Sequence, residues 1–237
     1  MAKDPKNKET ARDKETDEAR KWLRKSLERW GAQDIKIADT YFVYAYPRDN
    51  TRGGFNLNLI QSTELTREEG TGWFGWRVRI FNYGEGRDDR ARWIQFVNQN
   101  DAEMFQRAVN FLSDQCQRDT DVKNAADFEQ FKEKAKAWHA QAEKPALPEE
   151  ARQHKVLAEN AYREKDFDKM ISEYEVALKV FPCWPEGQFN LAFVCGEQKY
   201  YRTAILHMKC YLELVPNGPD AQAARDKIII WQDKIRR

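Results

Sequence analysis

The C-terminal part of the chain repeats itself at an offset of 34 residues. The matching positions are Leu157 and Leu191, Ala158 and Ala192, Phe167 and Tyr201, Ile171 and Ile205, Leu178 and Leu212, and Pro182 and Pro216. Each unit reads as a helix of about fourteen residues, a tight turn, a second helix and a closing proline. Because a single helical hairpin cannot bury its apolar face alone, the period predicts hairpins stacked in an array.

Prolines mark the ends of these units. Residues 181–194 read FPCWPEGQFNLAFV, in which Pro182 ends one unit and Pro185 begins the next. A proline at the first helical position costs no hydrogen bond, since the N–H that it lacks has no partner within the helix. We expect the same arrangement at Pro216 and Pro219.

The sizes of the side chains predict how the helices pack. Small residues are expected where two helices approach closely: Ala158, Ala177, Ala192 and Ala204. Larger residues are expected to fill the spaces around them: Leu157, Tyr174, Leu191 and Met208. The last segment is predicted to be a capping helix with a charged outer side, in which Ile228, Ile229 and Trp231 face the last repeat.

This pattern resembles the tetratricopeptide repeat, a 34-residue helical hairpin motif. The sequence departs from the family's pattern at the first bulky position, where His154 and Gln188 replace an aromatic residue, and at Met170 and Tyr211, where alanine is usual. The resemblance covers residues 148–237, about two and a half repeats. A plain helical bundle is the alternative, but a bundle has no reason to keep a fixed offset.

The resemblance implies a groove that is lined by the first helix of each pair and holds an extended or helical peptide segment. The residues that would line it are Arg152, Lys155, Glu159, Tyr162, Glu186, Phe189, Asn190, Phe193, Glu197 and Lys227. We expect docking through Phe189 and Phe193, whose burial contributes about 3–6 kcal/mol before ordering costs. In the alternatives, both phenylalanines pack between repeats, or a helix at 124–143 fills the groove.

Some members of the family clamp the terminal carboxylate of a chaperone with a set of five Lys, Asn and Arg residues. Lys155 and Asn190 match two of these positions, whereas Glu159, Asp220 and Ala224 replace the other three. Two of the replacements add negative charge beside the expected anion. We therefore predict that the chain does not bind such tails.

The N-terminal part predicts a small α+β domain over residues 19–117. A helix at 18–30 is expected from the spacing of Trp22, Leu23, Leu27 and Trp30, with Gly31 as its stop. Alternating side chains then predict antiparallel strands, and helical spacing returns after Asn100 with Asp101 as the cap. The order of these elements loosely resembles a pleckstrin-homology-like domain over residues 33–117, and another small α+β roll fits nearly as well.

The remaining segments complete the predicted organisation. Residues 1–18 are rich in charge, contain no large hydrophobic residue after Met1 and are expected to be disordered. Residues 118–147 predict a connecting helix that packs on one neighbour through Phe128, Phe131, Ala135 and Trp138. The fold class is thus an α+β N-terminal domain followed by an all-α tetratricopeptide-like array at 148–237.

The sequence indicates no catalytic or metal-binding constellation, and no cofactor is expected. Four cysteines, Cys116, Cys183, Cys195 and Cys210, lack metal-ligand or redox spacing and are interpreted as free thiols. His139, His154 and His207 have no ligand at the spacing of a metal site. Seven arginines of the sheet region are interpreted as a solvated strand face: Arg48, Arg52, Arg77, Arg79, Arg87, Arg90 and Arg92.

The balance of charge limits the kinds of partner that the chain is expected to bind. With 40 Lys and Arg residues against 39 Asp and Glu residues, no overall field favours nucleic acid or an anionic membrane. We expect a cytoplasmic adaptor or scaffold that binds another protein. A periplasmic or membrane-anchored location is expected instead if an N-terminal signal or anchor has been removed. The competing hypothesis is a membrane-peripheral or lipid-sensing protein led by the sheet domain.

Overall fold

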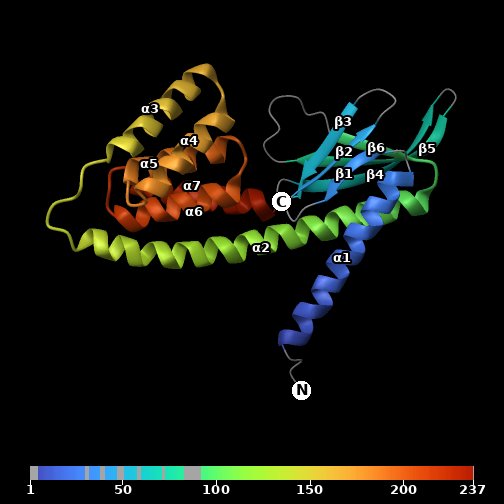
Figure 1. The fold of residues 1–237 in the computed structure, drawn as a ribbon, viewed down its shortest axis with the longest axis horizontal. Helices are drawn as coiled ribbons and strands as arrows, with labels where there is room; N and C mark the ends of the chain where they lie inside the picture. Colours follow the sequence, from blue (N-terminus) through green and yellow to red (C-terminus); the bar gives the residue numbers. More distant parts are fainter. Residues whose placement is uncertain are drawn as a thin grey trace. The chain divides into compact units, whose positions relative to one another are not determined.

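The computed structural model describes residues 5–29, 32–37, 41–46, 51–57, 60–70, 73–82 and 92–236. The chain divides into two compact units, Met1–Thr120 and Asp121–Arg237 (Figure 1). The first unit combines helices with antiparallel strands, and the second consists of helices and turns over its described residues. This confirms the predicted fold class at the level of an α+β region followed by a helical array.

The strands of the first unit form two three-stranded antiparallel meanders. Their bounds are β1 (Gln33–Ile37), β2 (Tyr41–Tyr46), β3 (Thr51–Asn56), β4 (Ile60–Gly70), β5 (Trp73–Asn82) and β6 (Arg92–Phe96). In β5 the predicted alternation is confirmed: Val78 and Ile80 are fully buried, while Arg77 and Arg79 are partly exposed. Val78 pairs with Ile94 of β6. The pleckstrin-homology-like resemblance stays a prediction.

Helix α1 (Pro5–Arg29) begins earlier than the sequence predicts. The expected core positions Leu23 and Leu27 are fully buried, whereas Trp30 and Gly31 lie outside the described residues. The charged segment that was expected to be disordered is helical from Pro5 onward. Its Lys, Glu, Arg and Ala residues are strong helix formers, and Arg12 contacts both Gln115 and Asp119 of the next helix.

Helix α2 (Gln99–His139) is one continuous helix, although the sequence predicts a closing helix and a separate connecting helix. Neither glycine nor proline occurs between residue 99 and residue 139, so nothing interrupts the hydrogen-bond ladder. The cap is Asn98 rather than Asp101: Asp101 donates its N–H to Asn98 Oδ1 (2.8 Å), and Asn98 Nδ2 donates back to Asp101 Oδ2 (2.8 Å). The Asn98 side chain thus satisfies one N–H of the first helical turn, and the Asp101 carboxylate holds that side chain in place.

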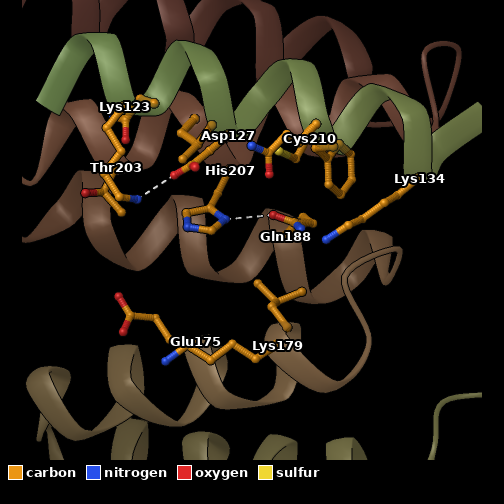
Figure 2. Close-up of a pocket in the computed structure, with 14 residues that line it drawn as sticks. Lys123, Asp127, Lys134, Glu175, Lys179, Gln188, Thr203, His207 and Cys210 are labelled. Carbon is orange, nitrogen blue, oxygen red and sulfur yellow. Dashed lines mark hydrogen bonds and ion pairs between the residues drawn. The ribbon is translucent and has the colours of Figure 1, made fainter.

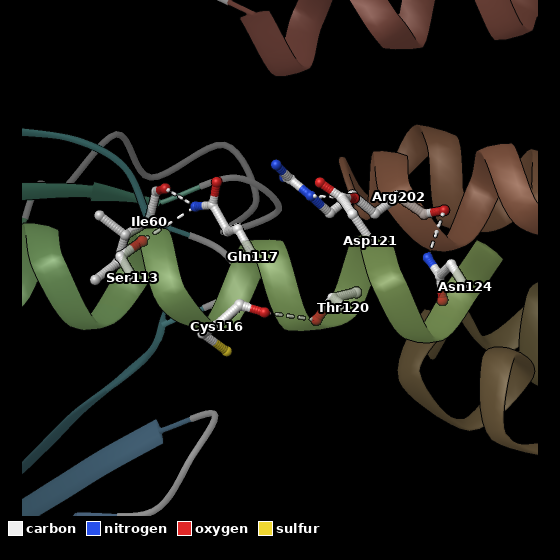
Figure 3. A network of polar contacts seen from close by, with 8 residues as sticks. All are labelled: Ile60, Ser113, Cys116, Gln117, Thr120, Asp121, Asn124 and Arg202. Atoms are coloured by element: carbon white, nitrogen blue, oxygen red, sulfur yellow. Dashed lines mark hydrogen bonds and ion pairs between the residues drawn. The ribbon is translucent and has the colours of Figure 1, made fainter. Parts of the chain in front are cut away.

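Polar side chains of α2 hold the chain on both sides of the boundary at residue 120 (Figure 3). In the first unit, Ser113 Oγ donates to the Leu57 carbonyl oxygen (2.8 Å) and Gln117 Nε2 to that of Ile60 (2.9 Å). In the second unit, Arg202 Nε donates to Asp121 Oδ1 at 2.9 Å. The part of α2 on each side of residue 120 is thus hydrogen-bonded to its own unit.

The second unit stacks two helical hairpins and a last helix, each packed on the next (Figure 1). The helices are α3 (Glu149–Glu164), α4 (Phe167–Val180), α5 (Pro185–Glu197), α6 (Tyr201–Leu214) and α7 (Ala221–Arg236). The predicted small positions are all fully buried: Ala158, Ala177, Ala192 and Ala204. Pro185 is at the start of α5 as expected, but α7 begins two residues after Pro219.

Backbone geometry repeats at the 34-residue offset. Lys165 and Lys199 both take a left-handed conformation, with φ of 60° and 64°. The following N–H groups bond in the same pattern, from Asp166 to the Ala161 carbonyl oxygen (2.9 Å) and from Tyr200 to that of Cys195 (2.8 Å). The two hairpins therefore turn in the same way.

A side-chain hydrogen bond repeats at the same offset with its partners exchanged. In the first hairpin His154 Nδ1 lies 2.7 Å from Glu173 Oε2. In the second hairpin, Gln188 takes the place of the histidine and His207 takes the place of the glutamate. His207 Nδ1 lies 2.7 Å from Gln188 Oε1. This contact joins the two helices of each hairpin, so equivalent positions in the sequence are equivalent in space.

The ends of the array differ from the predicted packing. Leu157 was expected to fill a space between helices, but it is 43% exposed, while its counterpart Leu191 is fully buried. Helix α3 is the first of the array, so no hairpin precedes it to cover Leu157. In α7, Trp231 is buried as expected, whereas Ile229 is 64% exposed and makes the outer side less polar than predicted.

The C-terminal half of α2 packs on the second hairpin. Phe131 and Ala135 are buried in one cluster with Cys183, Cys210 and Leu214. This cluster lies against α6 and the turn before α5. The alternative in which residues 124–143 fill the predicted groove is therefore wrong, because their apolar stripe is buried against α6.

Candidate functional site

The first-helix face is the surface formed by the predicted groove residues on α3, α5 and α7. Lys155 joins the first two of these helices, since its Nζ lies 2.8 Å from Glu186 Oε1 of α5 and 3.9 Å from Glu159 Oε1 of its own helix. The hydrogen bond to Glu186 raises the pKa of Lys155. This part of the face is an ion-paired bridge between neighbouring helices.

The other side of the face joins α5 to α7. Lys227 Nζ lies 3.9 Å from Glu197 Oε1 and 5.4 Å from the centroid of the Phe193 ring. Phe193 is 45% exposed, so one part of its ring stays accessible beside the ammonium group. Lys227 thus contacts both Phe193 and Glu197, and three of the predicted groove residues on α5 and α7 are brought together.

Phe189 does not share the exposure of Phe193. Its ring is partly buried and lies 5.0 Å from the Tyr211 ring of α6 in an edge-to-face arrangement. The neighbouring Asn190 donates from Nδ2 to the Tyr174 hydroxyl at 3.2 Å. Most of the Phe189 ring therefore packs within the array, as in the alternative of packing between repeats. Phe193 is the more accessible of the two phenylalanines.

Two predicted residues lie at the first hairpin without bridging helices of the face. Arg152 makes two 2.7 Å hydrogen bonds to Glu149 in its own helix. Tyr162 is 62% exposed, and its ring contacts Phe167 of α4 at 6.4 Å between centroids. The face therefore has an exposed aromatic side chain on α3 as well as on α5.

Sequence reasoning missed Ile230, which is 51% exposed on α7. It follows Tyr162 by twice the repeat length, with Gly196 at the position between them. Applying the 34-residue offset to the capping helix as well as to the two repeats would have identified Ile230 from the sequence. Phe193 is at a different repeat position, equivalent to Glu159 and Lys227. The name apolar row is used here for Tyr162, Phe193 and Ile230, the exposed apolar residues of the predicted face, one from each first helix.

The two residues that match the carboxylate clamp, Lys155 and Asn190, already have polar partners within the chain. Lys155 is paired with Glu186 and Glu159, and the amide of Asn190 is bonded to Tyr174. Ala224, at one of the basic positions of the clamp, is buried. A carboxylate tail would meet paired or buried groups at these positions, which supports the prediction that the chain does not bind it.

A hollow lies between α2, α4 and α6, on the side where α2 packs (Figure 2). Its volume is about 470 Å³, and Lys123, Lys134, Lys179, Asp127 and Glu175 are among the residues that line it. Lys123 Nζ lies 2.5 Å from Asp127 Oδ2. Charges of both signs surround this cleft, so its electrostatics select no single class of ligand.

His207 lines this cleft as a neutral ring. Gln188 donates its Nε2 hydrogen to the Pro182 carbonyl oxygen at 2.9 Å, so its Oε1 faces His207 Nδ1. Nδ1 therefore carries the proton, and Nε2 is an acceptor. Burial lowers the pKa of His207 to about 4. The ring consequently stays uncharged at neutral pH and serves the packing of α5 on α6.

The buried thiols are poor nucleophiles. All four cysteines are free and buried, which confirms the prediction of free thiols. Burial raises the pKa of Cys195 and of Cys210 to about 12. Since the thiolate is the reactive form, neither cysteine is prepared for covalent catalysis at neutral pH.

Other candidate sites receive little support from the part of the chain that the structure describes. There, His, Cys, Asp and Glu nowhere gather in a group of three or more that could hold a metal ion. Arg79 pairs with Glu64 at 3.8 Å, as expected of a solvated strand face. The side chains of five predicted arginines lie outside the described residues: Arg48, Arg52, Arg87, Arg90 and Arg92.

Over the same described residues, none of the helices combines the length and the apolarity that crossing a bilayer requires. In comparisons with known proteins, the chain matches no family model and no curated protein sequence. The case for a function therefore depends on the geometry of the helical array.

Proposed function

We propose that this chain is a non-enzymatic adaptor whose tetratricopeptide-like array docks a peptide segment of another protein on the first-helix face. Two observations support the resemblance to the tetratricopeptide family. The left-handed turns at Lys165 and Lys199 repeat at the family's period, and so does the contact between positions 154 and 173. A plain bundle has no reason to repeat either feature.

The apolar row is the observation that carries the proposal. Tyr162, Phe193 and Ile230 are 62%, 45% and 51% exposed, although each lies on a helix whose other side is packed in the core. Each of the three successive first helices thus leaves one apolar side chain exposed to water, and apolar side chains gathered on one face are typical of a surface that binds a partner. Covering them would contribute about 2–5 kcal/mol before ordering costs, which suits a weak and reversible contact.

The ion pairs of the face suggest how a partner would be oriented. Lys155 with Glu186 is a partly exposed pair, and Lys227 with Glu197 is a more exposed one. Exposed pairs contribute little to stability and exchange easily. A docked segment could therefore take over one member of a pair, so a partner with charged residues beside an apolar anchor fits best.

The test is a comparison of captured proteins. Wild type and the variant Phe193→Ala/Ile230→Ala are used to capture partners from source extract by cross-linking. The matched control is Val156→Ala/Ile229→Ala, which also removes two exposed apolar side chains but leaves the row intact. We expect the row variant to lose partners that the control retains. Equal recovery by all three proteins would show that the first-helix face is not the binding surface.

A further inference from the structure

Another hollow, here called the α7 cleft, lies between α2, α6 and α7 within the second unit. Its volume is about 530 Å³, within the range of about 300–1,000 Å³ that is usual for small-ligand sites. Four partly buried apolar side chains line it: Phe128, Ile205, Leu206 and Ile235. Its inner surface is therefore suited to an apolar group.

The charges around the α7 cleft are unevenly paired. Its two carboxylates are neutralised, since Asp121 pairs with Arg202 at 2.9 Å and Glu129 with Lys132 at 2.6 Å. Lys209 and Arg236 also line the cleft, and neither has a carboxylate partner among residues 121–236. Lys209 Nζ lies 5.9 Å from the centroid of the Phe128 ring, so this cation is beside the apolar lining and no carboxylate in that range neutralises it.

The wall near Asp121 is held in place by a second contact. Asn124 Nδ2 donates to the Arg202 carbonyl oxygen at 3.3 Å, so α2 and α6 are joined through both the backbone and the side chain of Arg202 (Figure 3). The Arg202 guanidinium is committed to Asp121. Lys209 and Arg236 are consequently the groups that distinguish one ligand charge from another.

The repeat motif does not require the basic and apolar side chains that α6 contributes to the α7 cleft. At the equivalent positions of α4, 34 residues earlier, Asp168, Ser172 and Glu175 take the places of Arg202, Leu206 and Lys209. The same helical geometry is therefore compatible with an acidic and polar surface. Leu206 also packs toward α2, but neither the repeat nor this packing requires cations beside it.

We infer that the α7 cleft binds a small amphiphilic carboxylate, in which an apolar chain lies on Phe128, Ile205 and Ile235 and a carboxylate group meets Lys209 and Arg236. An apolar lining excludes a strongly hydrated polyanion, and unpaired cations disfavour a cationic amphiphile. This site is separate from the first-helix face, so it does not rest on the proposed adaptor function.

The experiment uses three ten-carbon probes that differ only in the head group: decanoate, decanol and decylamine. Each is titrated into the full chain by calorimetry below its self-association concentration. We expect decanoate to bind about tenfold or more tightly than decanol, and decylamine to bind most weakly. If decanoate binds no more tightly than decanol, or decylamine equals decanoate, the assignment is overturned.

Variants locate the site. Lys209→Glu/Arg236→Glu should weaken decanoate binding about tenfold or more and leave decanol binding unchanged. Arg163→Glu/Lys169→Glu makes the same change of net charge at exposed residues that do not line the cleft, and it should bind as wild type does. Lys209→Gln/Arg236→Gln serves if the reversed variant loses its helical circular dichroism. Unchanged decanoate affinity in the cleft variant would refute the site.

Discussion

At the scale of single residues, His207 shows how the array can tolerate a titratable group in its packing. Its Nδ1–H bond to Gln188 and its burial keep the ring neutral, and the same burial makes protonation costly. The unfolded chain, with an ordinary histidine pKa of about 6.5, takes up a proton before the folded chain does. Stability is therefore fully present above that pH and is lost as the pH falls toward 4.

We predict that this residue alone lowers the free energy of unfolding by about 2 kcal/mol between pH 7 and pH 5. The measurement is urea unfolding of wild type and His207→Gln across this range. The variant should show a shallower loss with falling pH, whatever its stability at pH 7. His139→Gln, at an exposed ring, controls for the removal of one histidine. Parallel curves for wild type and His207→Gln would contradict the prediction.

At the scale of helices, the approach of α7 to α5 depends on the absence of a side chain. A Cβ atom added at Gly196 would lie 2.3 Å from Cζ2 of Trp231, far inside van der Waals contact. The Trp231 ring is 4% exposed and fills the core of the array, so it has little room to move. Gly196 therefore allows the last helix to pack.

We predict that Gly196→Ala destabilises the protein by about 1–3 kcal/mol, because overpacking outweighs the gain of about 1 kcal/mol from the better helix propensity of alanine. Thermal melts would measure the loss. Gly218→Ala is the matched control. Its added Cβ would lie 3.2 Å from the Tyr211 hydroxyl, a longer distance than at Gly196, so a smaller loss of stability is expected. A Gly196→Ala variant as stable as wild type would show that α5 and α7 can separate without cost.

The elements also show which features the sequence could predict. The period, the place of Pro185 and the buried alanines were predictable because every repeat must satisfy the same packing. Pro219 does not follow the pattern, since α7 begins two residues after it. The continuity of α2 was less visible, since its apolar stripe changes neighbours along its length and only the absence of breakers indicates one helix. The exposure of Leu157 was not predictable from the repeat, because a repeat pattern describes interior positions and not the ends of an array.

The candidate site likewise has features that the sequence could predict and features that it could not. The repeat positions named Lys155, Glu186, Phe193 and Lys227 as lining residues without pairing them. The structure shows Lys155 in contact with Glu186 and Lys227 in contact with Phe193, in both cases between neighbouring first helices. The repeat positions could not separate Phe189 from Phe193, because the difference depends on Tyr211, where the family usually has alanine. The α7 cleft was outside sequence reasoning altogether, as it depends on how α2 and α7 meet α6.

At the scale of the whole molecule, two separate cores imply that damage should stay within one unit. Leu191 is fully buried in a cluster that draws residues from α3 through α7, whereas α1 and the strands build their own cluster with the first half of α2. In a repeat array each hairpin is stabilised mainly by its neighbour. Loss of Leu191 should therefore weaken both hairpins together.

We predict that Leu191→Ala lowers the stability of the second unit by about 2–5 kcal/mol. Amide hydrogen exchange of the full chain would then speed up in α3 and α4 as well as in α5 and α6, because the cavity lies in the core that they share. Exchange in the strands should keep its wild-type rate, since β5 and β6 pack in the other cluster. Faster exchange confined to α5 and α6 would mean that the hairpins open independently, and faster exchange in the strands would mean that the continuous helix α2 couples the two cores.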